Sequence, residues 1–216
     1  MSSARSVRRA RAVESFRSAS EAIGEIVPGL AVFAITRGQW SMIDAIMACL
    51  DQTGPAAVSV WTWTIAEYEL EVMDRLRADQ RITAGLLVID AGVGRGERRA
   101  ADLKGHNRGV VDQWMATFGD GSVRHVTNHA KIATIEGGGF RLLLRGSMNL
   151  NGNPRFEQFD LTEGGRDFDL VRQIENELPL IRATAPHTEM SRACKLGEAW
   201  TQEDLLRFGK VKTWGK

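Results

Sequence analysis

Short apolar runs alternate with segments of helical periodicity along most of this chain, and this alternation constrains the fold more than any other feature. Continuous runs such as 30–35 and 86–89 are typical of buried strands. Between them, apolar residues three and four apart predict helices, as from Met42 to Leu50. The alternation predicts an α/β/α sandwich with a mixed, mainly parallel sheet. Further strands are expected at 57–64, 140–144 and 156–161, and further helices at 65–80, 110–118 and 168–178.

Charge is distributed unevenly along the 216 residues, which are enough for one well-buried α/β domain and few for two. The net charge is +1, yet residues 1–20 carry five arginines against one acid. Basic ends on a mildly acidic body indicate either phosphate or nucleic-acid contacts or solvated tails. We therefore expect a basic N-terminal arm (1–24), one folded domain (25–183) and a C-terminal tail (184–216) with a short helix.

The two cysteines, Cys49 and Cys194, have no metal-ligand spacing, which favours a reduced, cytoplasmic protein. Cys49 lies in an apolar helical pattern and is expected in the core. No apolar run approaches the roughly eighteen residues of a membrane-spanning helix. The N-terminus also lacks the apolar stretch of a signal peptide. Neither a membrane span nor a leader is therefore expected.

The stretch from His125 to Leu161 carries the main functional signal. His129 and Lys131 are two residues apart beside an apolar run, so on a strand their side chains would share one face. Gly137, Gly138 and Gly139 then allow the chain to turn back. The returning strand leads to Ser147 and Asn149, again two apart. An imidazole, an ammonium, a hydroxyl and an amide are thus expected to converge, and such a set suits a phosphate.

This pattern resembles the phospholipase D superfamily, whose members carry HxK(x)4D, then GSxN, then a further acid or amide on the next strand. The resemblance implies the phospholipase D-like α/β/α fold. Glu136 stands at the position of the family's aspartate, where the acid is structural rather than chemical, and Glu157 is the best candidate for the downstream acid. The residues that match the family letters directly are His129, Lys131, Gly146, Ser147 and Asn149.

The resemblance also implies a role for each residue. His129 would attack phosphorus and form a phosphohistidine, while Lys131 and Asn149 bind the phosphate oxygens. Ser147 would hydrogen-bond the phosphate or its neighbours, and Glu157 would hold the imidazole Nδ1–H. Metals and cofactors are not required, because the lysine and the amide supply the electrostatics.

Only one copy of the motif is present in the chain. The family's chemistry uses two histidines on opposite sides of the phosphorus. A one-copy member is therefore expected to form a homodimer, with the active site at the interface. A two-fold axis places one motif from each subunit in such a site.

Other residues near predicted strand ends are weaker candidates. Trp61 and Trp63 share a strand face and would either stack nucleic-acid bases or, as the preferred interpretation, pack in the core or a dimer interface. His125 would extend the site or, preferably, be a strand-end histidine. A loop after the strand 86–89 begins like a dinucleotide-binding motif but has Glu97 where the third glycine belongs. Its cations would instead guide a polyanion or be solvated; the main ones are Arg95, Arg98 and Arg99.

Three functions agree with these patterns. The favoured one is a small metal-independent phosphodiesterase acting as an endonuclease. The second is a phospholipase D that acts on phospholipid head groups. The third is a catalytically silent nucleic-acid-binding or assembly module on the same fold.

Overall fold

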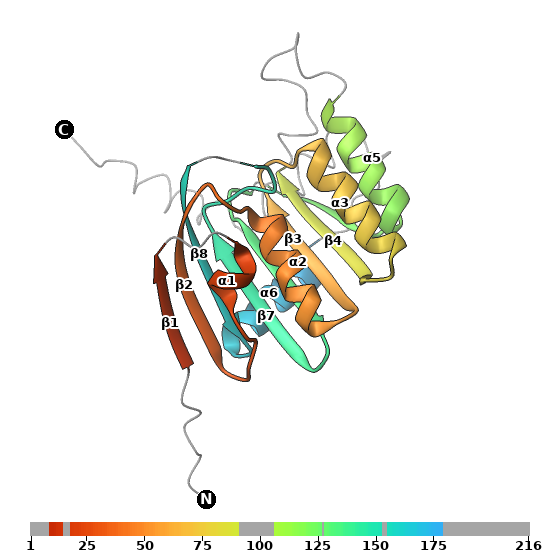
Figure 1. The fold of residues 1–216 in the computed structure, drawn as a ribbon. Helices are drawn as coiled ribbons and strands as arrows, with labels where there is room; N and C mark the ends of the chain where they lie inside the picture. Colours follow the sequence, from red (N-terminus) through yellow and green to blue (C-terminus); the bar gives the residue numbers. More distant parts are fainter. Residues whose placement is uncertain (1–8, 15–17, 91–105, 127, 153–154, 179–216) are drawn as a thin grey trace, which may run out of the picture.

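The computed structural model describes residues 9–14, 18–90, 106–126, 128–152 and 155–178. Within these ranges the chain forms one eight-stranded sheet, ordered β1-β2-β8-β7-β6-β3-β4-β5 (Figure 1). The strands are β1 (Arg9–Glu14), β2 (Leu30–Arg37), β3 (Ala56–Thr62), β4 (Ile82–Asp90), β5 (Val123–Val126), β6 (Ile132–Gly137), β7 (Phe140–Gly146) and β8 (Phe156–Glu163).

Helices lie on both faces of this sheet (Figure 1). They are α1 (Ala19–Ile23), α2 (Met42–Thr53), α3 (Glu67–Ala78), α5 (His106–Phe118) and α6 (Arg166–Glu177). The first four cover one face, and α6 covers the other. The mixed α/β class predicted from the alternation is confirmed. In the described ranges, no helix is long and apolar enough to cross a membrane.

The sheet is less parallel than expected. The pairs β1–β2, β3–β4 and β4–β5 are parallel, whereas β2–β8, β8–β7, β7–β6 and β6–β3 are antiparallel. The prediction of a mainly parallel sheet was therefore wrong. The reason is that β6, β7 and β8 follow one another without an intervening helix in the described residues. Only a crossover connection, usually through a helix, returns the chain in a parallel direction.

The larger core lies between the sheet and the four helices on its first face. The apolar side chains of α2, including Ile46 and Cys49, point into it, as their spacing predicted. Burial raises the pKa of the Cys49 thiol to about 12. Smaller clusters lie under α6, where Phe168 and Val171 pack against Leu143 of β7. The sheet is thus held from both sides, which fixes the strand ends that carry the candidate site.

Part of the segment 1–24, expected as a basic arm, belongs to the folded body. β1 pairs with β2 over six residues and forms one edge of the sheet. Ala19, Ala22 and Ile23 of α1 are buried in the larger core. These buried side chains follow Arg17, the last arginine of the segment. The expected C-terminal tail and Cys194 lie outside the described residues.

β6 and β7 form the hairpin that the consecutive glycines predicted. Gly137 pairs with Phe140, so Gly138 and Gly139 form a two-residue turn. Both turn residues have positive φ, 58° and 83°, which glycine adopts without strain. A side chain on Gly138 would overlap the carbonyl oxygen of Thr53 at the end of α2. The hairpin therefore packs closely on α2 at this point.

Candidate active site

The H-x-K segment does not lie on a strand, because β6 begins at Ile132, one residue after Lys131. An Asn turn replaces the expected strand: the Ala130 amide donates to Asn128 Oδ1 at 2.8 Å. Asn side chains commonly accept hydrogen bonds from nearby backbone amides, which then do not pair with a neighbouring strand. His129 lies within the turn and is exposed, whereas Lys131 is only 9% exposed.

The side chains of His129 and Lys131 nevertheless lie together. Lys131 Nζ is 3.1 Å from His129 Nδ1 and 3.4 Å from Nε2. The ammonium also donates to the His129 carbonyl oxygen at 2.8 Å. This local bond folds the lysine back toward the residue two before it. One ligand group placed beside the imidazole would therefore also meet the ammonium.

The G-S-x-N segment lies against the H-x-K segment. The Gly146 amide donates to the Lys131 carbonyl oxygen at 3.1 Å, and the Ser147 amide donates to Gln158 of β8 at 3.1 Å. A Cβ at Gly146 would overlap the Gln158 carbonyl oxygen, so only glycine allows this close approach. The two sequence motifs thus meet where β3 and β7 end and β6 and β8 begin.

Glu157 lies beside Ser147, whose Oγ donates to the carboxylate. The Gln158 amide donates to the same Oγ at 3.0 Å, which fixes the hydroxyl between two partners. Glu157 also acts on Lys131 through its charge. Burial lowers the pKa of the Lys131 ammonium, and the negative charge of Glu157 partly opposes this effect. The bond from Glu157 to the His129 imidazole stays a prediction.

Asn149 is half-buried, and its Oδ1 has no hydrogen-bond partner in the described part of the chain. Buried polar atoms without a partner are rare in folded proteins. Its neighbour Leu150 is fixed at both backbone groups: the amide donates to Thr62 Oγ1 at 3.2 Å, and the carbonyl accepts from Ala66 at 3.0 Å. The Oδ1 acceptor of Asn149 is thus unused within the described residues, while the backbone of the next residue is held in place.

A cleft of about 590 Å³ opens between the two motif segments. Lys131 and Ser147 both line it, one from each motif segment. Arg145 adds a second cation, which pairs with Asp167 at 3.1 Å. The lining residues are Ala130, Lys131, Ile132, Arg145, Gly146, Ser147, Gln158 and Asp160.

Two buried polar residues of the site were not singled out from the sequence. Asn128 is 6% exposed and Thr62 is 1% exposed, and both hydrogen-bond the motif segments. Asn128 carried a sequence signal, because an Asn side chain often accepts a hydrogen bond from the backbone amide two residues later and so begins a turn. Thr62 carried no such signal, since threonine is an ordinary residue at a strand end.

His125 does not extend the strand of His129. It lies in β5, a strand the sequence did not indicate separately, and pairs with Ile89 of β4. The side chain is 5% exposed, and burial lowers the pKa of its imidazole. β5 is at the edge of the sheet, beyond β4 and β3. His125 is therefore a buried residue of an edge strand.

Trp61 and Trp63 have different surroundings. Trp61 packs beneath α6, and its Nε1 donates to Glu175 of that helix at 2.8 Å. Trp63 follows the end of β3 and is 48% exposed. Its ring centroid lies 5.9 Å from that of His129, with the two planes at 42°. Of the two, Trp63 lies beside the candidate nucleophile. The proposed cationic loop, with Arg95, Arg98 and Arg99, lies outside the described residues.

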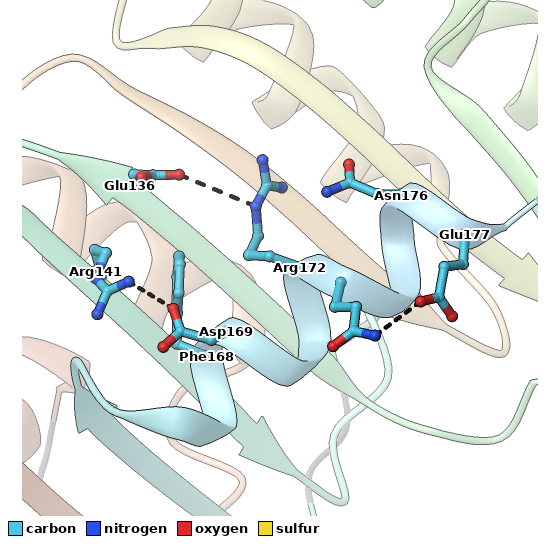
Figure 2. Close-up of a pocket in the computed structure, with 8 residues that line it drawn as sticks. Glu136, Arg141, Phe168, Asp169, Arg172, Asn176 and Glu177 are labelled. Carbon is cyan, nitrogen blue, oxygen red and sulfur yellow. Dashed lines mark hydrogen bonds and ion pairs between the residues drawn. The ribbon is translucent and has the colours of Figure 1, made fainter.

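A second cleft, of about 470 Å³, runs along α6 (Figure 2). Its cations are paired: Arg141 with Asp169 at 2.6 Å, and Arg172 with Glu136 at 4.0 Å. Glu136, at the position of the family's aspartate, thus faces α6 rather than Lys131.

No protein-family model matches the chain, and no curated protein sequence matches it. The site is therefore characterised by its own residues and geometry. These place an exposed imidazole, a buried ammonium and a fixed hydroxyl around one end of the sheet.

Proposed function

We propose that the protein is a metal-independent phosphodiesterase of the phospholipase D type that hydrolyses nucleic-acid phosphodiesters. The observation that carries this proposal is the contact between the exposed His129 imidazole and the ammonium group of Lys131, a residue that is only 9% exposed and lines the cleft. Imidazole is a nucleophile and proton carrier at neutral pH. A desolvated ammonium attracts a phosphate more strongly than a solvated one, because its local dielectric constant is lower.

The proposed reaction has two displacements. A ring nitrogen of His129 attacks phosphorus, and the P–N bond forms as the bond to the leaving oxygen breaks. The leaving oxygen takes a proton from His129 of the partner subunit. That imidazole then removes a proton from a water molecule, whose oxygen attacks phosphorus and breaks the P–N bond. One difficult step becomes two easier ones.

The second imidazole requires a homodimer with the site on its two-fold axis. The exposed position of His129 in a turn supports this arrangement, because a partner's copy can approach it. In the dimer, two Lys131 ammonium groups and two Asn149 amides surround the transferred phosphoryl group. They supply fixed positive charge and donors where negative charge develops. The negative charge of Glu157 favours the protonated form of Lys131, and its carboxylate accepts a hydrogen bond from Ser147 Oγ.

Nucleic acid is the favoured substrate because of Trp63. An exposed indole beside the nucleophile offers a flat surface on which a base stacks. On β8, the exposed ring of Phe156 lies with its centroid 5.8 Å from the Arg37 guanidinium. The second candidate substrate is a phospholipid head group, since Trp63 and Phe156 are also suited to a lipid surface.

The test is nicking of plasmid and single-stranded DNA in excess EDTA by the wild type and His129→Ala. Tyr68→Ala serves as the control, since Tyr68 is 63% exposed and lies on α3. A parallel assay measures head-group release from phosphatidylcholine and phosphatidylglycerol vesicles. We expect DNA cleavage that survives EDTA, is kept by Tyr68→Ala and is lost in His129→Ala.

Each other result has a distinct meaning. Head-group release without DNA cleavage would replace nucleic acid by lipid as the substrate. Cleavage by His129→Ala at the wild-type rate would contradict the assigned nucleophile. Inactivity of the wild type in both assays would contradict the enzymatic proposal and favour a silent binding module.

A further inference from the structure

One buried amide is hydrogen-bonded to three separate segments at the site. Asn128 Nδ2 lies 3.2 Å from the Thr62 carbonyl oxygen at the end of β3 and 3.4 Å from the Val88 carbonyl oxygen on β4. It also lies 3.4 Å from the carbonyl oxygen of Ala130, the residue between His129 and Lys131. Its Oδ1 accepts from the Ala130 amide at 2.8 Å. The side chain thus fixes the H-x-K segment to two strand ends.

The backbone of Asn128 is fixed as well. Its amide donates to Asp90 Oδ2, the last residue of β4, at 2.9 Å. Because Asn128 and Ala130 close a turn around His129, the direction of the imidazole depends on this one side chain. The turn also sets the start of β6, and with it the position of Lys131.

Thr62 connects the same point to the other motif. Its carbonyl oxygen accepts from Asn128, while its Oγ1 accepts from the Leu150 amide at 3.2 Å and donates to the Thr64 carbonyl oxygen at 2.6 Å. Leu150 follows Asn149 directly. A single residue at the end of β3 therefore bonds to both the H-x-K and the G-S-x-N segments.

We propose that Asn128 and Thr62 are positioning residues that set the His129–Lys131 pair in register with the Ser147–Asn149 segment. Neither needs to touch the substrate. Their effect on the reaction rate rests on the proposed phosphodiesterase function. Their effect on the position of His129 does not. Misplacing a reacting group by about 1 Å costs roughly 100-fold in rate, so such residues affect turnover rather than binding.

The test uses isosteric substitutions. Asn128→Asp keeps the acceptor toward Ala130 but places an oxygen against three carbonyl oxygens. Thr62→Val removes the hydroxyl, and Thr62→Ser keeps it. Thr134→Val is the matched control, because Thr134 is 2% exposed, lies on β6 and bonds Ser59 Oγ at 2.9 Å. Each protein is studied as the full chain by thermal unfolding, histidine-labelled NMR and steady-state kinetics on single-stranded DNA.

We expect Asn128→Asp and Thr62→Val to lower kcat by about 100-fold with little change in KM. Thr62→Ser should restore most of kcat. The His129 ring signals, assigned with His129→Asn, should shift in Asn128→Asp as the ring moves relative to Trp63. Thr134→Val should lower the melting temperature and change neither kcat nor these signals.

Unchanged His129 signals and unchanged kcat in folded Asn128→Asp would overturn the proposal, as would an equal loss of kcat in Thr134→Val. If Asn128→Asp does not fold, the kcat values of Thr62→Val and Thr62→Ser are compared. A kcat that is low in Thr62→Val and restored in Thr62→Ser supports the proposal, and equal kcat values overturn it. If the wild type shows no activity, the phosphodiesterase proposal fails separately. The NMR comparison then still supports or contradicts the positioning of His129.

Discussion

At the scale of single residues, Lys131 shows the conflict between burial and charge most clearly. Its side chain is nearly buried, and burial lowers the pKa of the ammonium. The negative charge of Glu157, on β8, opposes this shift. A phosphate needs the protonated form, so the two effects together decide the pH range in which the site binds an anion.

The alkaline limit of activity should therefore lie at a lower pH than for an ordinary lysine. As pH rises through the lowered pKa of Lys131, the ammonium becomes neutral and transition-state stabilisation is lost. Glu157→Gln removes the charge that raises this pKa, so the limit should move to lower pH. Lys131→Arg stays charged and should move it to higher pH, although with a lower maximal rate.

These shifts are measured as kcat/KM against pH for the three proteins. All buffers have the same ionic strength, because salt screens the interactions of exposed charges. Identical alkaline limits in all three proteins would show that Lys131 does not carry the charge on which activity depends.

At the scale of elements, the β6–β7 hairpin determines where both motifs begin and end. Its two turn glycines are conformationally similar but differ in their neighbours. Gly138 approaches the Thr53 carbonyl at the end of α2, whereas a Cβ on Gly139 meets nothing within 4 Å. Substitutions at these two positions therefore separate the energetic cost of backbone conformation from the cost of steric overlap.

Gly139→Ala should lower the free energy of unfolding by about 1 kcal/mol, the usual cost of a left-handed conformation for a residue with a side chain. Gly138→Ala should lower it by about 3 kcal/mol, because overpacking against Thr53 adds to that cost. Urea unfolding of both variants measures the difference. Equal losses would contradict the close packing of the hairpin on α2.

Elements with a continuous apolar run or a clear helical periodicity were predictable, and the two edge strands β1 and β5 were not. β2, β4 and α6 follow directly from their patterns, because burial on a long element leaves a clear periodicity. β1 and β5 have arginine or histidine among few apolar residues, and both lie at sheet edges. The candidate site residues were predicted from their motifs, but the hydrogen bonds of Asn128 at this site were not, since they join strands distant in sequence.

At the scale of the whole molecule, the protomer presents half of the proposed site. His129 is exposed, and its proposed reaction needs a second imidazole on the far side of the phosphorus. We therefore predict that the protein is a homodimer in solution and that only the dimer is active.

Mixing subunits tests this dependence. Wild-type protein unfolded and refolded with a fourfold excess of His129→Asn should lose more activity than dilution explains, because mixed dimers lack one of the two histidines. A refolded mixture with Tyr68→Ala serves as the control and should keep full activity. Activity proportional to the wild-type fraction would show that each subunit acts alone.

The stereochemical course at phosphorus shows whether the reaction passes through a phosphohistidine. A chiral phosphorothioate diester is cleaved in water enriched in oxygen-18, and the configuration of the product is determined. Two successive in-line displacements, the first by His129 and the second by water, should leave the configuration retained. Inversion would mean direct attack by water and would contradict the phosphohistidine mechanism.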